Sequence, residues 1–199
     1  LAFDVSDADT VTVGFSQHNS DSNGSTWGNL PLVDNDGNAI HYSGRSNSIG
    51  QPWTYWNLHT QRAFVELKHD FGNDWNATLT ATGQQEKQNT NMLYVGGVSG
   101  DVADAYANHT RSEAHQLLGE AKVQGPFSLF GREHQLTFGA AYGRTHQKGQ
   151  EYDEDLEHGS FFNTSFSGIL AGNTPMPSFG VTSDDLAQNF QDTQKSVFA

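Results

Sequence analysis

The side chains of this sequence that could do chemistry are nine histidines, 23 acidic residues and several aromatic residues within polar segments. His115 and His134 fall on neighbouring expected strands, but neither forms a close pair with a carboxylate in a metal-ligand pattern. The segment Asp34 to Gly37 resembles the start of a calcium loop but lacks the downstream glutamate, so we interpret it as a turn. No nucleophile elbow, phosphate loop or HExxH motif is present, and there is no cysteine. We therefore expect no enzyme, no resident cofactor and no metal site.

Aromatic residues in polar segments are the other candidates. Residues 19–55 are rich in Ser, Asn, Asp and Gly but contain Trp27, Trp53 and Tyr55, and a second polar segment, 88–108, contains Tyr94. Long loops that carry large aromatic residues are unusual unless they have a function. A flat ring can pack on a ligand while its hydroxyl or indole group donates a hydrogen bond.

The charge of the chain is strongly acidic. The formal net charge is -13, from 10 basic and 23 acidic side chains. A nucleic-acid partner would require a basic surface, so we expect none. Several acidic residues gather in 151–157, a run that we interpret as a solvated loop.

The element that organises the chain is the segment Ala63 to Gly83, where apolar and polar residues alternate on both sides of a tight turn at 72–74. This period of two predicts a β-hairpin. Phe71 and Trp75 bracket the turn, as expected where aromatic rings settle at a membrane interface. One face of the hairpin is apolar, and the other carries Glu66, Lys68 and several threonines.

Further alternating segments predict strands on both sides of this hairpin, at 1–5, 10–18, 110–123, 134–146 and 193–199. The connections alternate between short ones, at 6–9, 72–74 and 125–131, and long ones, at 19–55, 88–108 and 148–191. In an up-and-down meander this places all short turns at one end of the sheet. We predict an all-β fold: an antiparallel transmembrane β-barrel segment of about six strands, with short periplasmic turns and long extracellular loops.

The apolar side of the predicted sheet should contact lipid, and the polar side should line the barrel. We expect lipid contact at Val13, Val65, Leu79, Ala121 and Phe138. Mean hydropathy is low, at -0.62, and no run of about 18 apolar residues exists, which excludes a transmembrane helix bundle. Low hydropathy does not exclude a barrel, because only alternate residues of its strands face lipid.

Five segments of the sequence resemble motifs of a known family: TWGNLPLVDNDG (26–37), PWTYWN (52–57), AFVELKHDFGNDW (63–75), LYVGG (93–97) and GPFSLFGREHQLTFGAAY (125–142). In order and spacing they resemble TonB-dependent ferric-siderophore receptors, in particular the branch with the ferric pyoverdine and ferric coprogen receptors. The resemblance runs over nearly the whole chain.

The resemblance implies a plugged barrel of about 22 strands in the cell outer membrane that imports a ferric siderophore with energy from TonB. Residues 1–199 would form part of the barrel domain, with no counterpart of the plug domain or the TonB box. Leu1 already lies in an alternating pattern, so we expect a fragment or a processed chain. TonB would then contact the parent protein through its missing N-terminal region, and iron would arrive only as the ferric chelate.

The resemblance also implies site residues, because the family binds its chelate with aromatic and polar side chains on the outer side. The positions within matching motifs are Trp27, Trp53, Tyr55, Trp56 and Tyr94. Arg45, in the first long loop, could pair with an anionic ligand. The competing interpretation places Trp56 and Tyr94 in the outer aromatic girdle and leaves Arg45 solvated.

Two other classes remain open at this point. A passive porin or adhesin barrel would show the same alternation without binding a chelate. A soluble β-sandwich, such as a carbohydrate-binding module, would use its loop aromatics to stack on sugars.

Overall fold

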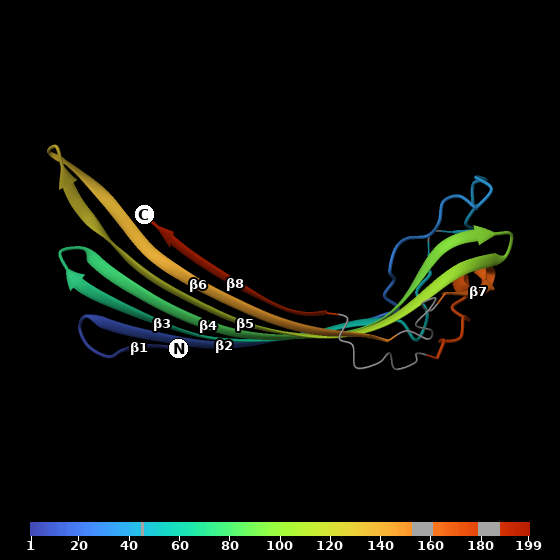
Figure 1. The fold of residues 1–199 in the computed structure, drawn as a ribbon, viewed down its shortest axis with the longest axis horizontal. Helices are drawn as coiled ribbons and strands as arrows, with labels where there is room; N and C mark the ends of the chain where they lie inside the picture. The colour runs from blue at the N-terminus through green and yellow to red at the C-terminus, as the bar shows by residue number, and fades with distance from the viewer. Residues whose placement is uncertain (45, 153–160, 179–187) are drawn as a thin grey trace.

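The computed structural model describes residues 1–44, 46–152, 161–178 and 188–199. Within these ranges the chain forms one long antiparallel sheet that curves strongly along its length (Figure 1). The strands are β1 (Ala2–Asp4), β2 (Asp9–Asn23), β3 (Tyr55–Gly72), β4 (Trp75–Ser99), β5 (Val102–Leu129), β6 (Arg132–Tyr152), β7 (Phe161–Ser165) and β8 (Gln188–Phe198). Their order in the sheet is β1-β2-β3-β4-β5-β6-β8, and β7 pairs with the first residues of β5. The predicted up-and-down meander is confirmed.

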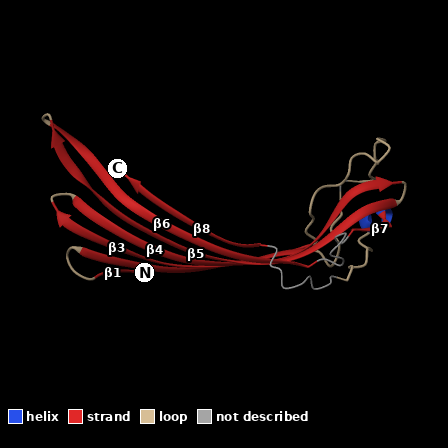
Figure 2. Ribbon diagram, viewed as in Figure 1, coloured by secondary structure: helices blue, strands red, loops and turns tan. Residues whose placement is uncertain are grey.

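The short connections lie together at one end of the sheet, as the sequence predicts (Figure 2). The β3–β4 turn places Asn73 and Asp74 at φ 53° and 61°, and the β5–β6 turn places Phe130 and Gly131 at φ 52° and 75°. Asn, Asp and Gly tolerate this left-handed conformation, which explains the tight β3–β4 turn and the position of Gly131, whereas Phe130 adopts it without such a preference. The predicted connection at 125–131 is shorter still, because β5 continues to Leu129.

The structure corrects the prediction of a long loop at 88–108. These residues belong to β4 and β5, which continue as a hairpin to a turn at Gly100 and Asp101, with a register shift between Val95 and Gly97. Residues 90–93 are all buried, so the sequence shows no alternation there. Strands covered on both faces lose the period of two on which the prediction depended.

The predicted loop at 148–191 also contains regular structure. The strand β6 continues to Tyr152, and a strand and a helix, β7 and α1 (Phe166–Leu170), follow within the segment. Residues 153–157 of the acidic run lie outside the described residues. The first long loop, which the sequence places at 19–55, is confined to 24–54, because β2 and β3 pair as far as Asn23 and Tyr55.

The register gives the sheet one apolar face and one polar face. Val13 stands opposite Val65, Leu79 opposite Ala121, and Phe138 opposite Val123. The five residues expected to contact lipid therefore share one face, and four of them, Val13, Val65, Leu79 and Phe138, are 37–54% exposed. We call this side the apolar face. The side that carries Thr80, opposite Glu66 and Glu120, is the polar face.

In the described residues no second sheet packs on the apolar face, so the sandwich alternative loses its support. Exposed apolar side chains on one face and polar ones on the other are the pattern of a barrel wall. No helix among the described residues is long and apolar enough to cross a membrane.

The hydrophobic core lies at the other end, where loops cover the apolar side of the β4–β5 hairpin. Leu93, Ala105, Ile49 and Ile169 are 0–2% exposed there. The side-chain amide of Gln51 connects the first loop to residues 169–174. Its Nε2 donates to the carbonyl oxygen of Ile169 (2.9 Å), and its Oε1 accepts from the backbone N–H of Thr174 (3.0 Å). We call the part formed by residues 24–54, the β4–β5 hairpin and residues 161–178 the loop lobe.

Candidate ligand-binding site

Four aromatic rings meet on the polar side of the loop lobe. Tyr94 and Tyr106 stand directly opposite each other on β4 and β5. The ring centroid of Trp27 lies 6.2 Å from that of Tyr94 and 5.8 Å from that of Tyr106, and the ring of Phe161 lies 4.8 Å from that of Tyr106. We call these four residues the aromatic cluster. Tyr94 and Tyr106 have the same strand parity as Thr80 and Glu120, so the cluster continues the polar face.

Backbone pairing holds each ring of the cluster in place. The N–H of Trp27 donates to the carbonyl oxygen of Leu93 (3.2 Å), and Phe161 is fixed opposite Tyr106 by the pairing of β7 with β5. Gly28 has a φ of 104°, and a Cβ added there would lie 3.0 Å from the Tyr94 ring. The Trp27 segment therefore approaches Tyr94 closely because residue 28 is glycine.

The cluster is open to solvent, so it can accept a ligand. Trp27, Tyr94 and Phe161 are 49%, 42% and 69% exposed. Their faces suit a planar, partly apolar ligand, and the Tyr hydroxyls and the indole N–H add hydrogen bonds. Apolar rings left exposed beside a fixed backbone are a pre-organised binding surface, since little order has to be gained on binding.

The structure brings together two of the predicted site residues, Trp27 and Tyr94. Trp56 lies on the same polar face, 44% exposed, but stands opposite Thr90, further along the sheet from the cluster. Arg45 lies outside the described residues.

Trp53 and Tyr55 lie away from the cluster. Trp53 packs against the core, and its indole Nε1 donates to the carbonyl oxygen of Thr174 (2.8 Å). Tyr55 belongs by strand parity to the apolar face, where its hydroxyl donates to Oδ1 of Asn89 (3.4 Å). Both residues thus have partners within the protein, and their place in the ligand site stays a prediction.

Sequence reasoning missed Tyr106 and Phe161. Tyr106 falls in the segment that the sequence assigns to a loop, so nothing there places it opposite Tyr94. The Gly100-Asp101 pair was a usable signal, because such a dipeptide commonly forms a hairpin turn and folds Tyr106 back onto Tyr94.

Three of the described histidines lie beside carboxylates. His115 Nε2 lies 3.1 Å from Glu113 Oε1, His69 Nδ1 lies 2.7 Å from Asp9 Oδ1, and His59 Nε2 lies 3.6 Å from Asp21 Oδ1. The sequence did not reveal these neighbours. Across the described ranges, no group of three or more His, Cys, Asp or Glu side chains is placed to hold a metal ion.

Comparison with known proteins finds that this chain is similar to part of several outer-membrane receptors. It is 31% identical over 163 residues to the ferripyoverdine receptor of Pseudomonas aeruginosa, covering 76% of this chain and 19% of that protein. It is also 31% identical over 156 residues to a ferric-pyoverdine receptor of another Pseudomonas strain, covering 74% of this chain and 18% of that protein. No protein-family model matches the chain.

A solved structure shows the same fold. The crystal structure of the ferripyoverdine receptor of the outer membrane of Pseudomonas aeruginosa, bound to ferripyoverdine, superposes with a TM-score of 0.82 at 24% identity. The superposition covers 98% of this chain and 26% of that one. The chain spans about a fifth of the length of the curated relatives that it matches.

The fold, the two faces of the sheet and the relatives together define this chain as a segment of an outer-membrane β-barrel. More particularly, it is a homologue of the ferripyoverdine receptors, the group that its sequence motifs resemble. The predicted resemblance, fold and outer-membrane location are confirmed.

Proposed function

We propose that this chain is part of an outer-membrane receptor that binds a ferric siderophore of the pyoverdine type and imports it with energy supplied through TonB. The observation that carries the proposal is the aromatic cluster, four rings on the polar face at the loop end of the sheet, three of which are exposed. The names of the relatives and the ferripyoverdine-bound structure support the same ligand class.

The chemistry of the cluster suits such a chelate. A pyoverdine carries a flat aromatic chromophore and a peptide, so it offers one surface for ring stacking and several hydrogen-bonding groups. Trp27 and Phe161 provide the stacking surfaces, and the hydroxyls of Tyr94 and Tyr106 provide polar contacts. We place the chelate against the cluster on the barrel side of the sheet. Trp56, on the same face, is available to a larger part of the ligand.

A binding titration of the full-length protein in detergent tests this proposal. Ferric pyoverdine should quench tryptophan fluorescence saturably, and Trp27→Ala should weaken the binding by about tenfold or more, a loss of about 1.4 kcal/mol. Trp53→Phe keeps an aromatic ring in the core and serves as the control that should leave the affinity unchanged. No saturable binding by a correctly folded protein would favour the passive-barrel alternative.

Import requires a second measurement. Cells that depend on this protein for iron should take up radioactive iron from ferric pyoverdine, and deletion of TonB should abolish uptake while surface binding persists. Uptake that continues without TonB would contradict the energy source that we propose.

A further inference from the structure

The strand β7 presents one ring to the aromatic cluster and the next ring to the hydrophobic core. Phe161 and Phe162 are consecutive in this strand, so their side chains lie on opposite faces of the sheet. Phe161 stands opposite Tyr106, and the two ring centroids are 4.8 Å apart. Phe162 stands opposite Ala105 and packs against the core. A ligand that contacts Phe161 therefore contacts a strand whose other face belongs to the core.

Helix α1 continues directly from β7 into the core. The strand ends at Ser165, and the helix begins at Phe166. Phe166 and Ile169 are both buried, and the Phe166 ring packs edge-on against Tyr42 of the first loop, with centroids 6.4 Å apart. The core lies on the apolar side of the β4–β5 hairpin, so α1 and the aromatic cluster are on opposite sides of it.

Asp101, in the β4–β5 turn, holds the junction between the strand and the helix. Its carbonyl oxygen accepts from the backbone N–H of Phe166 (2.8 Å). Its carboxylate accepts from the hydroxyl of Ser165 (2.8 Å) and from the backbone N–H of Ser167 (2.7 Å). Among the described residues, β7 pairs with β5 alone, along five residue pairs. Short paired strands are only marginally stable by themselves, so the bonds of Asp101 help to keep β7 docked.

We propose that ligand binding at the aromatic cluster is coupled to the docking of β7 and α1, with Asp101 as the positioning residue. A ligand that packs on Phe161 stabilises the pairing of β7 with β5, and the paired strand keeps α1 in the core. By linkage, loss of docking lowers the affinity for the ligand by the same factor as the ligand raises the docking equilibrium. The inference rests on the proposed function, because the ligand is the chelate that we place against the cluster.

The cluster offers a matched pair of rings for a test. Trp27 and Phe161 are both exposed, and both contact Tyr106. Trp27 belongs to the first loop, whose N–H at this residue bonds to Leu93 on β4, whereas Phe161 belongs to the segment that continues into α1. Removal of either ring should weaken binding, but only the loss of Phe161 should disconnect the ligand from the helix.

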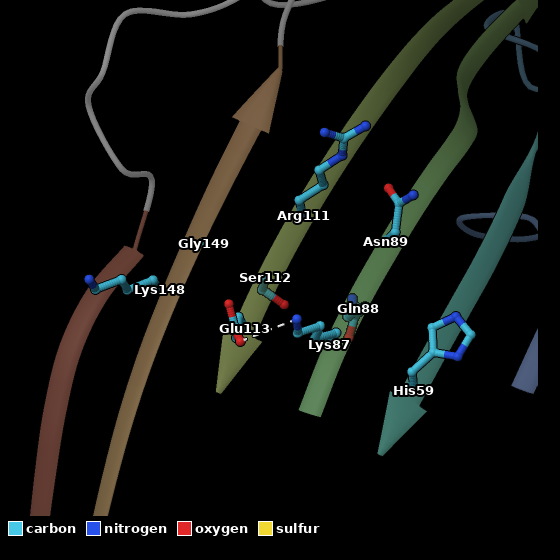
Figure 3. Close-up of a pocket in the computed structure, with 9 residues that line it drawn as sticks. All are labelled: His59, Lys87, Gln88, Asn89, Arg111, Ser112, Glu113, Lys148 and Gly149. Atoms are coloured by element: carbon cyan, nitrogen blue, oxygen red, sulfur yellow. Dashed lines mark ion pairs between the residues drawn. The ribbon is translucent and has the colours of Figure 1, made fainter. Parts of the chain in front are cut away.

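A groove further along the sheet provides an internal reference. It has a volume of about 430 Å³ and is lined from β3, β4, β5 and β6, with the ion pair between Lys87 and Glu113 in its lining (Figure 3). None of its lining residues belongs to β7 or α1. The amides that border this groove, at 87–89 and 111–113, should therefore not respond to the docking of α1.

Hydrogen exchange of the full-length protein in detergent, with and without ferric pyoverdine at saturation, tests the coupling. In the wild type, the chelate should slow exchange at 166–171 by about fivefold or more, and leave 87–89 and 111–113 unchanged. Trp27→Ala, saturated at a higher chelate concentration, should keep this slowing, and Phe161→Ala should lose it. Without any ligand, Phe161→Ala should already accelerate exchange at 166–171 relative to Trp27→Ala, because β7 loses its contact with Tyr106.

Affinity provides a second measurement. Asp101→Ala should weaken ferric-pyoverdine binding by about fivefold or more. The double variant Asp101→Ala/Phe161→Ala should bind no more weakly than Phe161→Ala, because both changes act through one segment. A residue that only stabilises the fold would instead give independent losses that multiply.

Three outcomes would overturn the coupling. They are unchanged exchange at 166–171 in the wild type with the chelate bound, equal behaviour of Phe161→Ala and Trp27→Ala, and losses of affinity that multiply in the double variant. Heat-modified mobility on gels checks that each variant folds. Fluorescence titration reports chelate binding separately: a folded wild-type protein that binds no chelate contradicts the proposed function, and the exchange of the two ligand-free variants still decides whether Phe161 holds α1.

Discussion

Tyr94 and Tyr106 face each other across β4 and β5, and the ring of Trp27 lies within about 6 Å of both, at 6.2 and 5.8 Å. The loop that carries Trp27 thus lies against the polar side of the hairpin, while residues 49–54 cover its apolar side. The hairpin is held from both sides, so its exposed rings have a fixed arrangement before any ligand arrives.

Tyr106→Ala should weaken ferric-pyoverdine binding by about tenfold, because it removes the ring that contacts both Trp27 and Phe161. Tyr142→Ala is the matched control: it removes a tyrosine that is 41% exposed on the apolar face, far from the cluster. Fluorescence titration of both variants measures the two dissociation constants. Equal affinity in the two variants would exclude the cluster from the binding site.

Sequence alone predicts the part of the sheet in which one face is apolar and the other polar. Val65, Leu79 and Ala121 alternate with polar residues because one face of the sheet is apolar and the other is polar along this part of the strands. The alternation therefore predicts the strands and the face on which each residue lies. The alternation fails near Leu93, which is fully buried by segments distant in the sequence. The proximity of Trp27 to Tyr106 was missed for the same reason, since it depends on a hairpin that the alternation does not reveal and that only the turn signal at Gly100-Asp101 indicates.

The two faces of β4 predict opposite responses to a new charge. Leu79→Lys places an ammonium on the apolar face beside Leu67 and Ala121, and should cost about 2–4 kcal/mol in a bilayer. Thr80→Lys, one residue further, places the same group between Glu66 and Glu120 on the polar face and should be tolerated. Urea unfolding of the full-length protein from lipid vesicles measures the difference. Equal destabilisation by both variants would contradict the assignment of the faces.

The lipid contacts can be measured directly. Spin labels at Val13, Val65, Leu79, Ala121 and Phe138 should be accessible to oxygen and protected from a water-soluble nickel complex, because lipid dissolves oxygen and excludes the complex. Labels at Thr80 and Glu120 on the polar face provide the comparison. Water accessibility at most of the five positions would rule out a membrane-facing side.

Gln51 should be the residue on which the loop lobe depends most. Its amide is 1% exposed and bonds to the backbone of Ile169 and Thr174. The carbonyl oxygen of Ile169 also accepts from the N–H of Gly172, so Gln51→Ala removes the bonded partner of the Thr174 N–H alone, at a cost of about 1–3 kcal/mol. Hydrogen exchange should accelerate at 166–174. Gln61→Ala, at an exposed position of β3, is the control and should not change exchange there. Unchanged protection in Gln51→Ala would mean that apolar packing alone holds the lobe.

Acid should release helix α1 from the hairpin, because one carboxylate holds its start. Asp101 Oδ1 accepts from the backbone N–H of Ser167 (2.7 Å), and Oδ2 accepts from the hydroxyl of Ser165 (2.8 Å). The N–H bond of Ser167 is the largest cause that lowers the pKa of Asp101 below its ordinary value of 3.8, and the two serine hydroxyls add to it. A lowered folded-state pKa means that this carboxylate stabilises the docked helix above the unfolded pKa and loses its effect as the pH falls through the folded value.

The expected result is a pH-dependent change in the protection of residues 161–171. Hydrogen exchange, corrected for its intrinsic pH dependence, should show stable protection at neutral pH and a loss that begins below about pH 4. Asp101→Asn keeps a similar shape but cannot ionise, so it should already show weaker protection at neutral pH, with little further change on acidification. Asp34→Asn is the control: its carboxylate accepts from the backbone N–H groups of Asp36 and Asn38 in a separate turn, so the Asp101-dependent loss should remain. If wild type and Asp101→Asn lose protection in parallel as the pH falls, another group must control the docking of α1.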